Sequence, residues 1–217
     1  MTNEATLQFL ETFITEQRRE RFAKVINQRT KHFTVAVEDV YQLHNTSAVI
    51  RSCDVFGIQD IHIIEEVNIK KIDREIAMGA QKWVDVHRYQ STASCIDSLR
   101  TKGYQIVATS PHKKDTNLSE FDISQPSCFF FGRETEGLSA QVLDQADQFI
   151  KIPMVGFTES LNISVSAAII LQQLTTRLKS SEINWELTSD EKINKRLDWC
   201  KTTLKNHNAL IKRFKES

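Results

Sequence analysis

Short β-branched runs alternate with helical segments through the middle of this chain, and this alternation limits the fold more than any other feature. Residues 33–40 (FTVAVEDV) and 60–64 (DIHII) have the composition of β-strands. Between them, residues 44–47 (HNTS) open a helix, with Asn45 or Thr46 as its cap, and Gly57 can end it. Strand, short helix and strand form a βαβ unit, in which the strands are parallel. We therefore predict an α/β fold with a mostly parallel sheet and flanking helices.

The same patterns continue along the chain. Further strands are predicted at residues 84–89, 103–110, 128–132 and 147–152, and further helices at 92–102, 140–143 and 163–174. The apolar residues of the 163–174 segment point in almost every direction around its axis, which predicts a helix buried on more than one side. Residues 65–83 are expected to be irregular and partly helical.

Both ends of the chain are predicted to be helical extensions. Apolar residues recur at helical spacing over residues 4–29, which predicts one helix there. Thr188 or Ser189 can cap a second, basic helix, which carries eight basic residues and one acidic residue over 192–215. We expect an N-terminal extension over 1–33, a central domain over 34–178 and a C-terminal extension over 179–217.

Three predicted strands end at residues that could line one crevice. Thr109, Gly132 and Ile152 each lie at or near the carboxyl end of a strand, where ligands bind in open parallel sheets. Neither G-x-G-x-x-G nor G-x-x-x-x-G-K occurs, so a nicotinamide or nucleoside-triphosphate enzyme is not expected. In the segment after the last strand, Ser160 or Asn162 can cap the helix that follows.

Three stretches resemble the signatures of one enzyme family, and they occur in the family's order. HNTSAVIRSCDVFG (44–57), FFFGRETEGLS (129–139) and IPMVGFTESLNISVSAA (152–168) are similar to the signatures of the SpoU class of RNA ribose 2′-O-methyltransferases. The resemblance extends over roughly residues 35–176. It implies a deep trefoil knot in an α/β domain, a homodimer, and S-adenosylmethionine as the cofactor. By the same resemblance, the cofactor contacts are Thr109, Gly132, Ile152 and Leu161.

The resemblance also implies which residues serve catalysis. Arg51 matches the family's essential arginine, and four polar residues match those that shape the site: Asn45, Glu134, Ser160 and Asn162. A guanidinium with a pKa above about 12 is a poor base at neutral pH. We therefore expect Arg51 to bind a phosphate and to stabilise the developing alkoxide of the ribose, and its role as proton acceptor stays open. Without the resemblance, these polar residues would be plain helix caps, a turn residue and a surface charge.

The charge distribution favours a polyanionic partner at the two ends. The formal net charge is zero, but residues 1–34 carry +2, residues 177–217 carry +4 and residues 35–176 carry −6. We predict that RNA is bound by basic residues of both extensions: Arg18, Arg19, Arg21, Lys192, Lys195 and Arg196. A solvated helix face is the alternative at the N-terminus, and a membrane surface is the alternative for the C-terminal helix.

The two terminal extensions limit the choice of RNA substrate. Only about 33 residues precede the first strand, too few for the additional domain that ribosomal-RNA members carry. Short helical extensions at both ends resemble the branch that methylates guanosine 18 in the tRNA D-loop, which is the predicted function. The alternatives are another RNA site, either the tRNA wobble ribose or ribosomal RNA, or a non-catalytic RNA-binding protein.

Cysteine usage and hydropathy indicate the compartment. The four cysteines (53, 95, 128 and 200) are scattered without ligand spacing, which predicts free thiols in a reducing environment. No apolar run of 18 residues and no secretory signal occur in the 217 residues. We expect a cytoplasmic protein that binds neither a metal nor a membrane.

Overall fold

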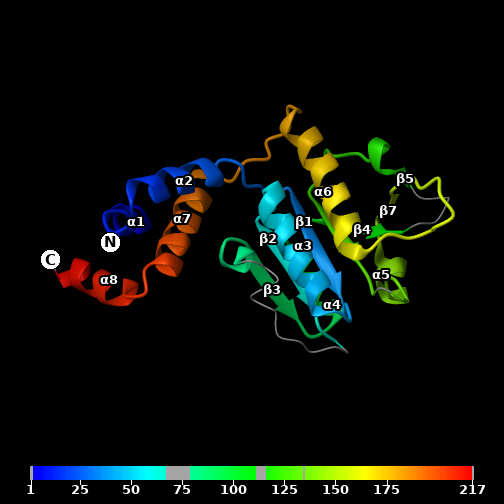
Figure 1. The fold of residues 1–217 in the computed structure, drawn as a ribbon, viewed down its shortest axis with the longest axis horizontal. Coiled ribbons are helices and arrows are strands. Elements are labelled where there is room, and N and C mark those ends of the chain that lie inside the picture. Colours follow the sequence, from blue (N-terminus) through cyan, green and yellow to red (C-terminus); the bar gives the residue numbers. More distant parts are fainter. Residues whose placement is uncertain (1, 67–78, 111–115, 134, 217) are drawn as a thin grey trace. The chain divides into compact units, whose positions relative to one another are not determined.

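The computed structural model describes residues 2–66, 79–110, 116–133 and 135–216. The chain divides into two compact units (Figure 1). Met1–Thr30 and Glu186–Ser217 together form the helical unit, and Lys31–Trp185 form the sheet unit. The predicted irregular segment over 65–83 lies mostly outside the described residues.

The sheet unit is built on parallel strands, which confirms the predicted α/β class. The described residues form seven strands in the order β3-β2-β1-β6-β4-β7-β5, and every pair of neighbours is parallel. The strands are β1 (Phe33–Glu38), β2 (Asp60–Ile64), β3 (Asp85–Tyr89), β4 (Gln105–Thr109), β5 (Thr116–Asn117), β6 (Ser127–Phe131) and β7 (Gln148–Lys151).

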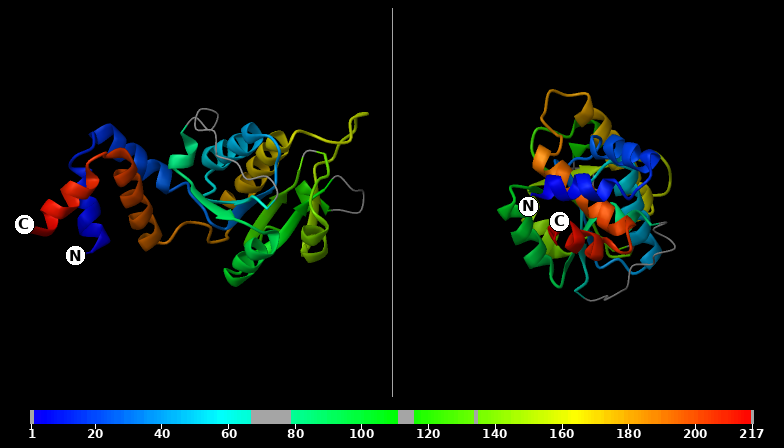
Figure 2. Two further views of the ribbon diagram at one scale, coloured as in Figure 1. Left: turned by 90° about the horizontal axis from the view of Figure 1, so that it is seen from below. Right: turned by 90° about the vertical axis from the view of Figure 1, so that its left-hand side faces the viewer.

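Helices cover both faces of this sheet. On one face, α3 (Leu43–Phe56) and α6 (Ile163–Lys179) pack against each other over the larger apolar core. On the other face, α4 (Thr92–Thr101) and α5 (Ala140–Gln145) cover the smaller core, and Figure 2 shows α4 and α3 on opposite sides of the strands. Two short 3-10 helices are η1 (Ala80–Lys82) and η2 (Leu118–Glu120). Because both faces are covered, the central strand β6 is buried at every position and its sequence, SCFFF, is largely apolar.

The strand order creates one crevice at the carboxyl edge of the sheet. From β1 the chain adds β2 and β3 on one side, and then crosses to build β4 on the other side of β1. Such a reversal leaves the loops after the neighbouring strands diverging, so a ligand can enter between them. The ends of β4, β6 and β7, which carry Thr109, Gly132 and Ile152, lie beside one another at this edge.

The helical unit corrects the prediction of one long helix at each end. Residues 4–29 form two helices, α1 (Asn3–Glu11) and α2 (Glu16–Ile26), because the Thr15 side chain caps α2 by accepting from the backbone N–H of Arg18. The C-terminal segment also forms two helices, α7 (Ser189–Thr203) and α8 (His207–Glu216). The predicted cap at Thr188 is confirmed, since Thr188 and Glu191 form a reciprocal capping box.

The two extensions share one core within the helical unit. Helix α7 packs on α1 and α2, and α8 packs on α1. The ring of Trp199 lies 5.4 Å from that of Phe22, and the buried Arg29 guanidinium lies 5.7 Å from the Trp199 ring. Trp199 is therefore a core residue of this unit and not part of a membrane-binding face.

Helix α6 departs from its predicted burial. Its buried side consists of Ile163, Ala167, Ile170, Leu171, Leu174 and Leu178. Val165 and Ile169 are 46% and 37% exposed. A single chain thus buries one side of α6 and leaves an apolar strip on the other. The trefoil knot implied by the resemblance stays a prediction, and none of the described helices is long and apolar enough to cross a membrane.

Candidate active site

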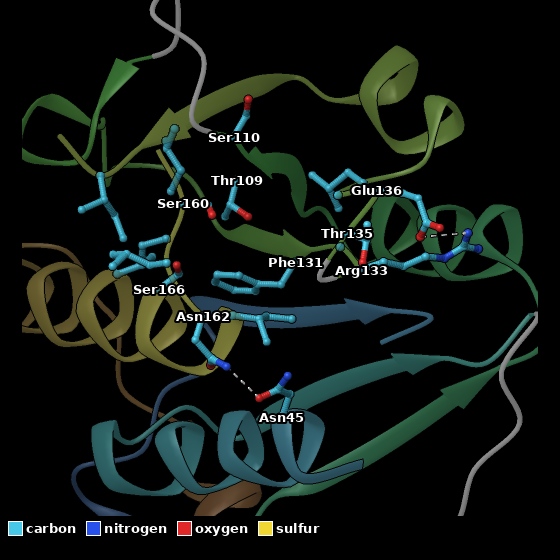
Figure 3. A pocket seen from close by; sticks show the side chains of 18 of the residues that line it. Asn45, Thr109, Ser110, Phe131, Arg133, Thr135, Glu136, Ser160, Asn162 and Ser166 are labelled. Carbon is cyan, nitrogen blue, oxygen red and sulfur yellow. Dashed lines mark hydrogen bonds and ion pairs between the residues drawn. The ribbon is translucent and has the colours of Figure 1, made fainter. Parts of the chain in front are cut away.

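A pocket of about 700 Å³ lies at the carboxyl edge of the sheet (Figure 3). Its walls come from the ends of β4, β6 and β7 and from the first turns of α3 and α6. The lining combines apolar side chains, including Phe131, Leu138, Ile150, Ile152, Met154 and Leu161, with hydroxyl and amide groups. Ligand sites of a few hundred to about 1,000 Å³ with few placed polar groups accept nucleoside-sized molecules.

The predicted cofactor residues all line this pocket. Thr109, Gly132, Ile152 and Leu161 come from four separate segments and meet around one volume. The Thr109 hydroxyl donates to the Phe130 carbonyl at 2.7 Å, and the backbone N–H of Ser110 donates to the Ile150 carbonyl at 3.0 Å. These bonds tie the ends of the three strands together and set the floor of the pocket.

Gly132 occupies a position that admits no side chain. A Cβ atom there would lie 2.2 Å from the backbone carbon of Gly137, closer than real Cβ contacts. The turn closes on itself through two hydrogen bonds between the backbones of Arg133 and Gly137, at 2.9 and 3.0 Å. Gly137 has a φ of +73°, which favours glycine. The absence of a side chain at Gly132 therefore lets the turn close on itself, and both glycines line the pocket.

Two asparagines join the helices that border the pocket. Asn162 is the N-cap of α6, as predicted, and its Oδ1 accepts from the backbone N–H of Ser164 at 2.8 Å. Its Nδ2 donates to Asn45 Oδ1 at 3.1 Å, as Figure 3 shows. The predicted cap at Asn45 or Thr46 is wrong, because α3 starts at Leu43, after Gln42. Asn45 is instead a buried residue of the first turn of α3, and Gly57, with a φ of +83°, ends that helix as predicted.

Arg51 lies apart from the pocket within one chain. Ser160 and Asn162 line the pocket, whereas Arg51 is exposed on α3 and is not among the residues that line it. Six residues of helix turn a side chain by about 240°, so Arg51 cannot face the direction that Asn45 faces. Glu134, the remaining predicted catalytic residue, lies outside the described residues.

The loop between β6 and α5 is held by charged side chains. Arg133 Nη2 lies 3.1 Å from Asp39 Oδ2, and this carboxylate raises the pKa of the Arg133 guanidinium. The Tyr41 hydroxyl donates to both carboxylate oxygens of Glu136, at 3.0 and 3.1 Å, and the hydrogen bond to Glu136 raises the pKa of Tyr41. Both Arg133 and Glu136 line the pocket.

Several lining residues were not predicted from the sequence. They include Gln42, Ser110, Phe131, Met154, Ser166 and Ile170. Ser110 and Phe131 adjoin the predicted cofactor residues Thr109 and Gly132, Met154 lies two residues after Ile152, and Ser166 lies one helical turn after Asn162. The same strand-end and helical spacing could therefore have identified them.

The predicted RNA-binding cations fall into two groups. Arg18, Arg19 and Arg21 are exposed on α2, and their side chains form no ion pair with other described residues. The α7 cations form ion pairs within the unit: Lys192 with Glu186 at 2.5 Å, Lys195 with Asp198 at 3.2 Å, and Arg196 with the buried Glu11.

The four cysteines are buried free thiols, and no metal-ligand cluster is found among the described residues. Cys53, Cys95, Cys128 and Cys200 are free and buried, which confirms the prediction of buried thiols. Burial raises the pKa of Cys95 and of Cys200 to about 12. In the part of the chain that the structure describes, no three His, Cys, Asp or Glu residues are grouped as metal ligands.

Comparisons with known proteins agree with this arrangement. The model of the SpoU rRNA Methylase family matches residues 32–172. The tRNA (guanosine(18)-2'-O)-methyltransferase of Borreliella burgdorferi is 41% identical over 198 residues, which make up 91% of each chain. The A. aeolicus TrmH/SpoU tRNA modifying enzyme superposes with a TM-score of 0.77 at 32% identity, covering 87% of this chain and 98% of that one.

A further solved structure carries a ligand. The AdoMet-bound rRNA methyltransferase of Sinorhizobium meliloti superposes with a TM-score of 0.61 at 25% identity, covering 70% of this chain and 59% of that one. The family match covers well over half of the 217 residues and includes every residue that lines the pocket. From its sheet topology, its pocket and these matches, the chain belongs to the SpoU rRNA methylase family.

Proposed function

We propose that this chain transfers a methyl group from S-adenosylmethionine to the ribose 2′-hydroxyl of guanosine 18 in tRNA. The extent of the match to the guanosine-18 enzyme of B. burgdorferi supports this choice of substrate. That match spans 198 residues, whereas the sheet unit contains 155, from Lys31 to Trp185. The similarity therefore extends beyond the sheet unit, which contains the pocket, into the helical unit.

The pocket suits the proposed cofactor. Its apolar side chains can enclose an adenine ring, and two glycines of the closed turn, Gly132 and Gly137, line it without side chains. A related structure contains AdoMet. Thr109, Gly132, Ile152 and Leu161 would hold the cofactor, which when bound would supply an electrophilic methyl group on a sulfonium, with a neutral thioether as the leaving group.

The chain's own residues then have to position the ribose. Asn162 is fixed by two interactions, as the cap of α6 and as donor to Asn45, so the polar rim of the pocket is held before RNA binds. Arg51 is assigned the adjacent phosphate and the developing negative charge on the 2′-oxygen. A permanently charged guanidinium serves both tasks without a change of protonation state.

A homodimer would reconcile the position of Arg51 with this role. Val165 and Ile169, one helical turn apart, form an exposed apolar strip on α6, and Val55 of α3 is 66% exposed. Arg51 lies four residues before Val55, so both side chains lie on the same exposed face of α3. We propose that two copies pair through this strip, and that Arg51 of one copy acts at the pocket of the other.

The exposed cations of α2 are the proposed tRNA contacts. Arg18, Arg19 and Arg21 are exposed and form no ion pair with described residues, so they can bind phosphates without breaking an existing interaction. Lys192, Lys195 and Arg196 would each have to leave a carboxylate, which makes them weaker candidates. This assignment narrows the prediction made from charge alone.

The acceptor atom can be tested with a modified substrate. A tRNA with 2′-deoxyguanosine at position 18 keeps the base and lacks only the proposed acceptor oxygen. We expect methyl transfer to this tRNA to be abolished, while its binding stays within about twofold of the unmodified tRNA. Full methylation of the deoxy substrate would place the acceptor elsewhere. A tRNA with deoxyguanosine at a different D-loop position is the matched control.

A further inference from the structure

The last residue of β1 and the segment that connects β1 to α3 contact the pocket loop at three points. The pocket loop is defined here as residues 132, 133 and 135–139. Glu38 accepts from the backbone N–H and the hydroxyl of Ser139, at 2.9 and 2.7 Å. Asp39 pairs with Arg133, and Tyr41 donates to Glu136. The connecting segment leads directly into α3, which carries Asn45 and Arg51.

Asp39 has an unusual backbone for a non-glycine residue. Its φ is +47°, and among the described residues no other non-glycine residue has a positive φ. Aspartate and asparagine adopt this left-handed conformation more readily than most residues do. Strained backbone of this kind persists where the surrounding structure holds it, and it is concentrated at functional sites.

The Asp39 carboxylate is buried, and its partner Arg133 is one of the residues that line the pocket. The side chain of Asp39 is 2% exposed and that of Arg133 is 26% exposed. A buried carboxylate needs a charged partner or several hydrogen-bond donors, because removal from water is costly. Loss of the guanidinium would therefore disturb Asp39 and, through it, the turn that begins at Gly132. Arg133 and Gly137 also close that turn through their backbones.

We propose that Asp39 and Arg133 are a positioning pair, which fixes the shape of the pocket loop for the cofactor and connects that loop to the start of α3. The proposal rests on the proposed function only for the identity of the ligand. Neither side chain is assigned to the chemical step. The pair joins the pocket loop to the segment that leads into α3, and so couples the cofactor side of the pocket to the helix that carries Arg51.

Cofactor binding measured by calorimetry with S-adenosylmethionine tests the pair. Asp39→Asn keeps a residue that tolerates the backbone and removes the charge, and Arg133→Gln removes the partner. We expect each variant to bind the cofactor about tenfold more weakly, the size of effect that losing a charge-assisted hydrogen bond produces. Arg133→Gln also removes the ion pair of Arg133 Nη1 with Glu136, at 3.8 Å. The double variant should therefore bind no more than about twofold more weakly than Arg133→Gln, which already lacks the interaction that Asp39→Asn removes.

Two further variants separate positioning from general stability. Arg133→Lys keeps the positive charge and should recover at least about half of the lost binding free energy, measured as a Kd within about threefold of wild type. Arg100→Gln removes an ion pair of similar length, 3.2 Å to Asp147, whose members do not line the pocket, and should leave the Kd unchanged. In steady-state assays the loss should appear in KM for the cofactor, with kcat changed by less than about threefold.

The outcomes distinguish this pair from the proposed function. If wild type binds the cofactor and Arg133→Gln binds it equally well, the positioning pair is refuted and the proposed function stands. Additive losses in the double variant would also refute it, since independent residues give additive effects. If Asp39→Asn fails to fold, the Kd values of Arg133→Gln and Arg133→Lys test the proposal. Equal Kd values for these two variants would refute it. Absence of cofactor binding by the wild-type chain would contradict the proposed function itself.

Discussion

Asn162 Nδ2 donates a 3.1 Å hydrogen bond to Asn45 Oδ1, which joins the N-cap of α6 to the first turn of α3. The same Asn162 side chain accepts from the backbone N–H and the hydroxyl of Ser164, at 2.8 and 2.6 Å. One amide thus serves both the stability of α6 and the geometry of the pocket. These two roles use different atoms, the oxygen for the cap and the nitrogen for Asn45, so they can be separated by substitution.

The first prediction concerns Asn162. Asp is as good an N-cap as Asn, so Asn162→Asp should unfold within about 1 °C of wild type, while it loses the donor to Asn45 and at least about tenfold in kcat/KM. Asn162→Ala loses the cap as well, at about 1 kcal/mol, and should melt about 2–4 °C lower. Thermal unfolding and methyl-transfer rates measure the two effects. Equal activity of Asn162→Asp and wild type would show that the donor is dispensable.

The second prediction concerns the turn at Gly132. Gly132→Ala places a Cβ 2.2 Å from the Gly137 backbone, so the turn has to open and the cofactor should bind at least about tenfold more weakly. Gly156→Ala is the matched control, because a Cβ there meets only the Thr158 nitrogen, at 3.9 Å, and φ is not positive. Calorimetry with S-adenosylmethionine compares the two. Wild-type affinity in Gly132→Ala would contradict the close packing described for this turn.

The third prediction concerns the proposed dimer and Arg51. At a cofactor concentration well below the Kd of Gly132→Ala, Arg51→Ala and Gly132→Ala should each have little activity, and mixing them with subunit exchange should restore activity. Random pairing makes about half of the dimers mixed, each with one intact site, so about a quarter of wild-type activity is expected. If Arg51 acts at the pocket of its own chain, every site in the mixture carries a defect and no activity returns. Light scattering should give the mass of two chains, and substitution of Val165 by Glu should halve it.

The sequence predicted the sheet better than the helical ends, for a physical reason. The bounds of β2 were predicted correctly because its isoleucines are followed by the acidic Glu65 and Glu66, which are rare in strands, and Gly57 ends α3 as predicted. The break between α1 and α2 was missed because the apolar spacing continues across it, and only the cap at Thr15 marks it. Local periodicity cannot show where a threonine side chain competes with the helix backbone.

The site was predictable where it follows from topology. Thr109, Gly132 and Ile152 meet because parallel strands end at one edge, a rule that needs only the strand assignment. The position of Arg51 was not deduced, although its spacing from Asn45 already implies a different helical face. The pairing of Asp39 with Arg133 depends on tertiary packing across 94 positions and leaves no local signal.

The fourth prediction compares the two groups of basic residues. Replacing Arg18, Arg19 and Arg21 by Gln should weaken tRNA binding and lower the slope of log K against log salt by roughly 2–3, since each phosphate contact adds somewhat less than one. Replacing Lys192, Lys195 and Arg196 by Gln should change the slope by less than about one. That variant should lose stability instead, because Glu11 stays buried without Arg196. Equal salt slopes for the two triple variants would refute the assignment to α2.

The fifth prediction concerns pH and His62. Burial, and secondarily the neighbouring His87, lower the pKa of His62 to about 3, below the ordinary value of about 6.5. Between these values the unfolded chain binds the proton and the folded chain does not, so stability falls as the pH is lowered from about 7 towards 4. His62→Gln should flatten this dependence by up to about 1.4 kcal/mol per pH unit, measured by urea unfolding. His44→Gln, an exposed histidine on α3, should leave it unchanged.

The position of the methyl group on tRNA tests the central claim most directly. The purified chain is incubated with S-adenosylmethionine carrying a labelled methyl group and with unmethylated tRNA, and nuclease fragments are then analysed by mass spectrometry. The account predicts one labelled nucleotide, 2′-O-methylguanosine at position 18, with the label on the ribose. A label at position 34, a label on a base, or no transfer at all would contradict it.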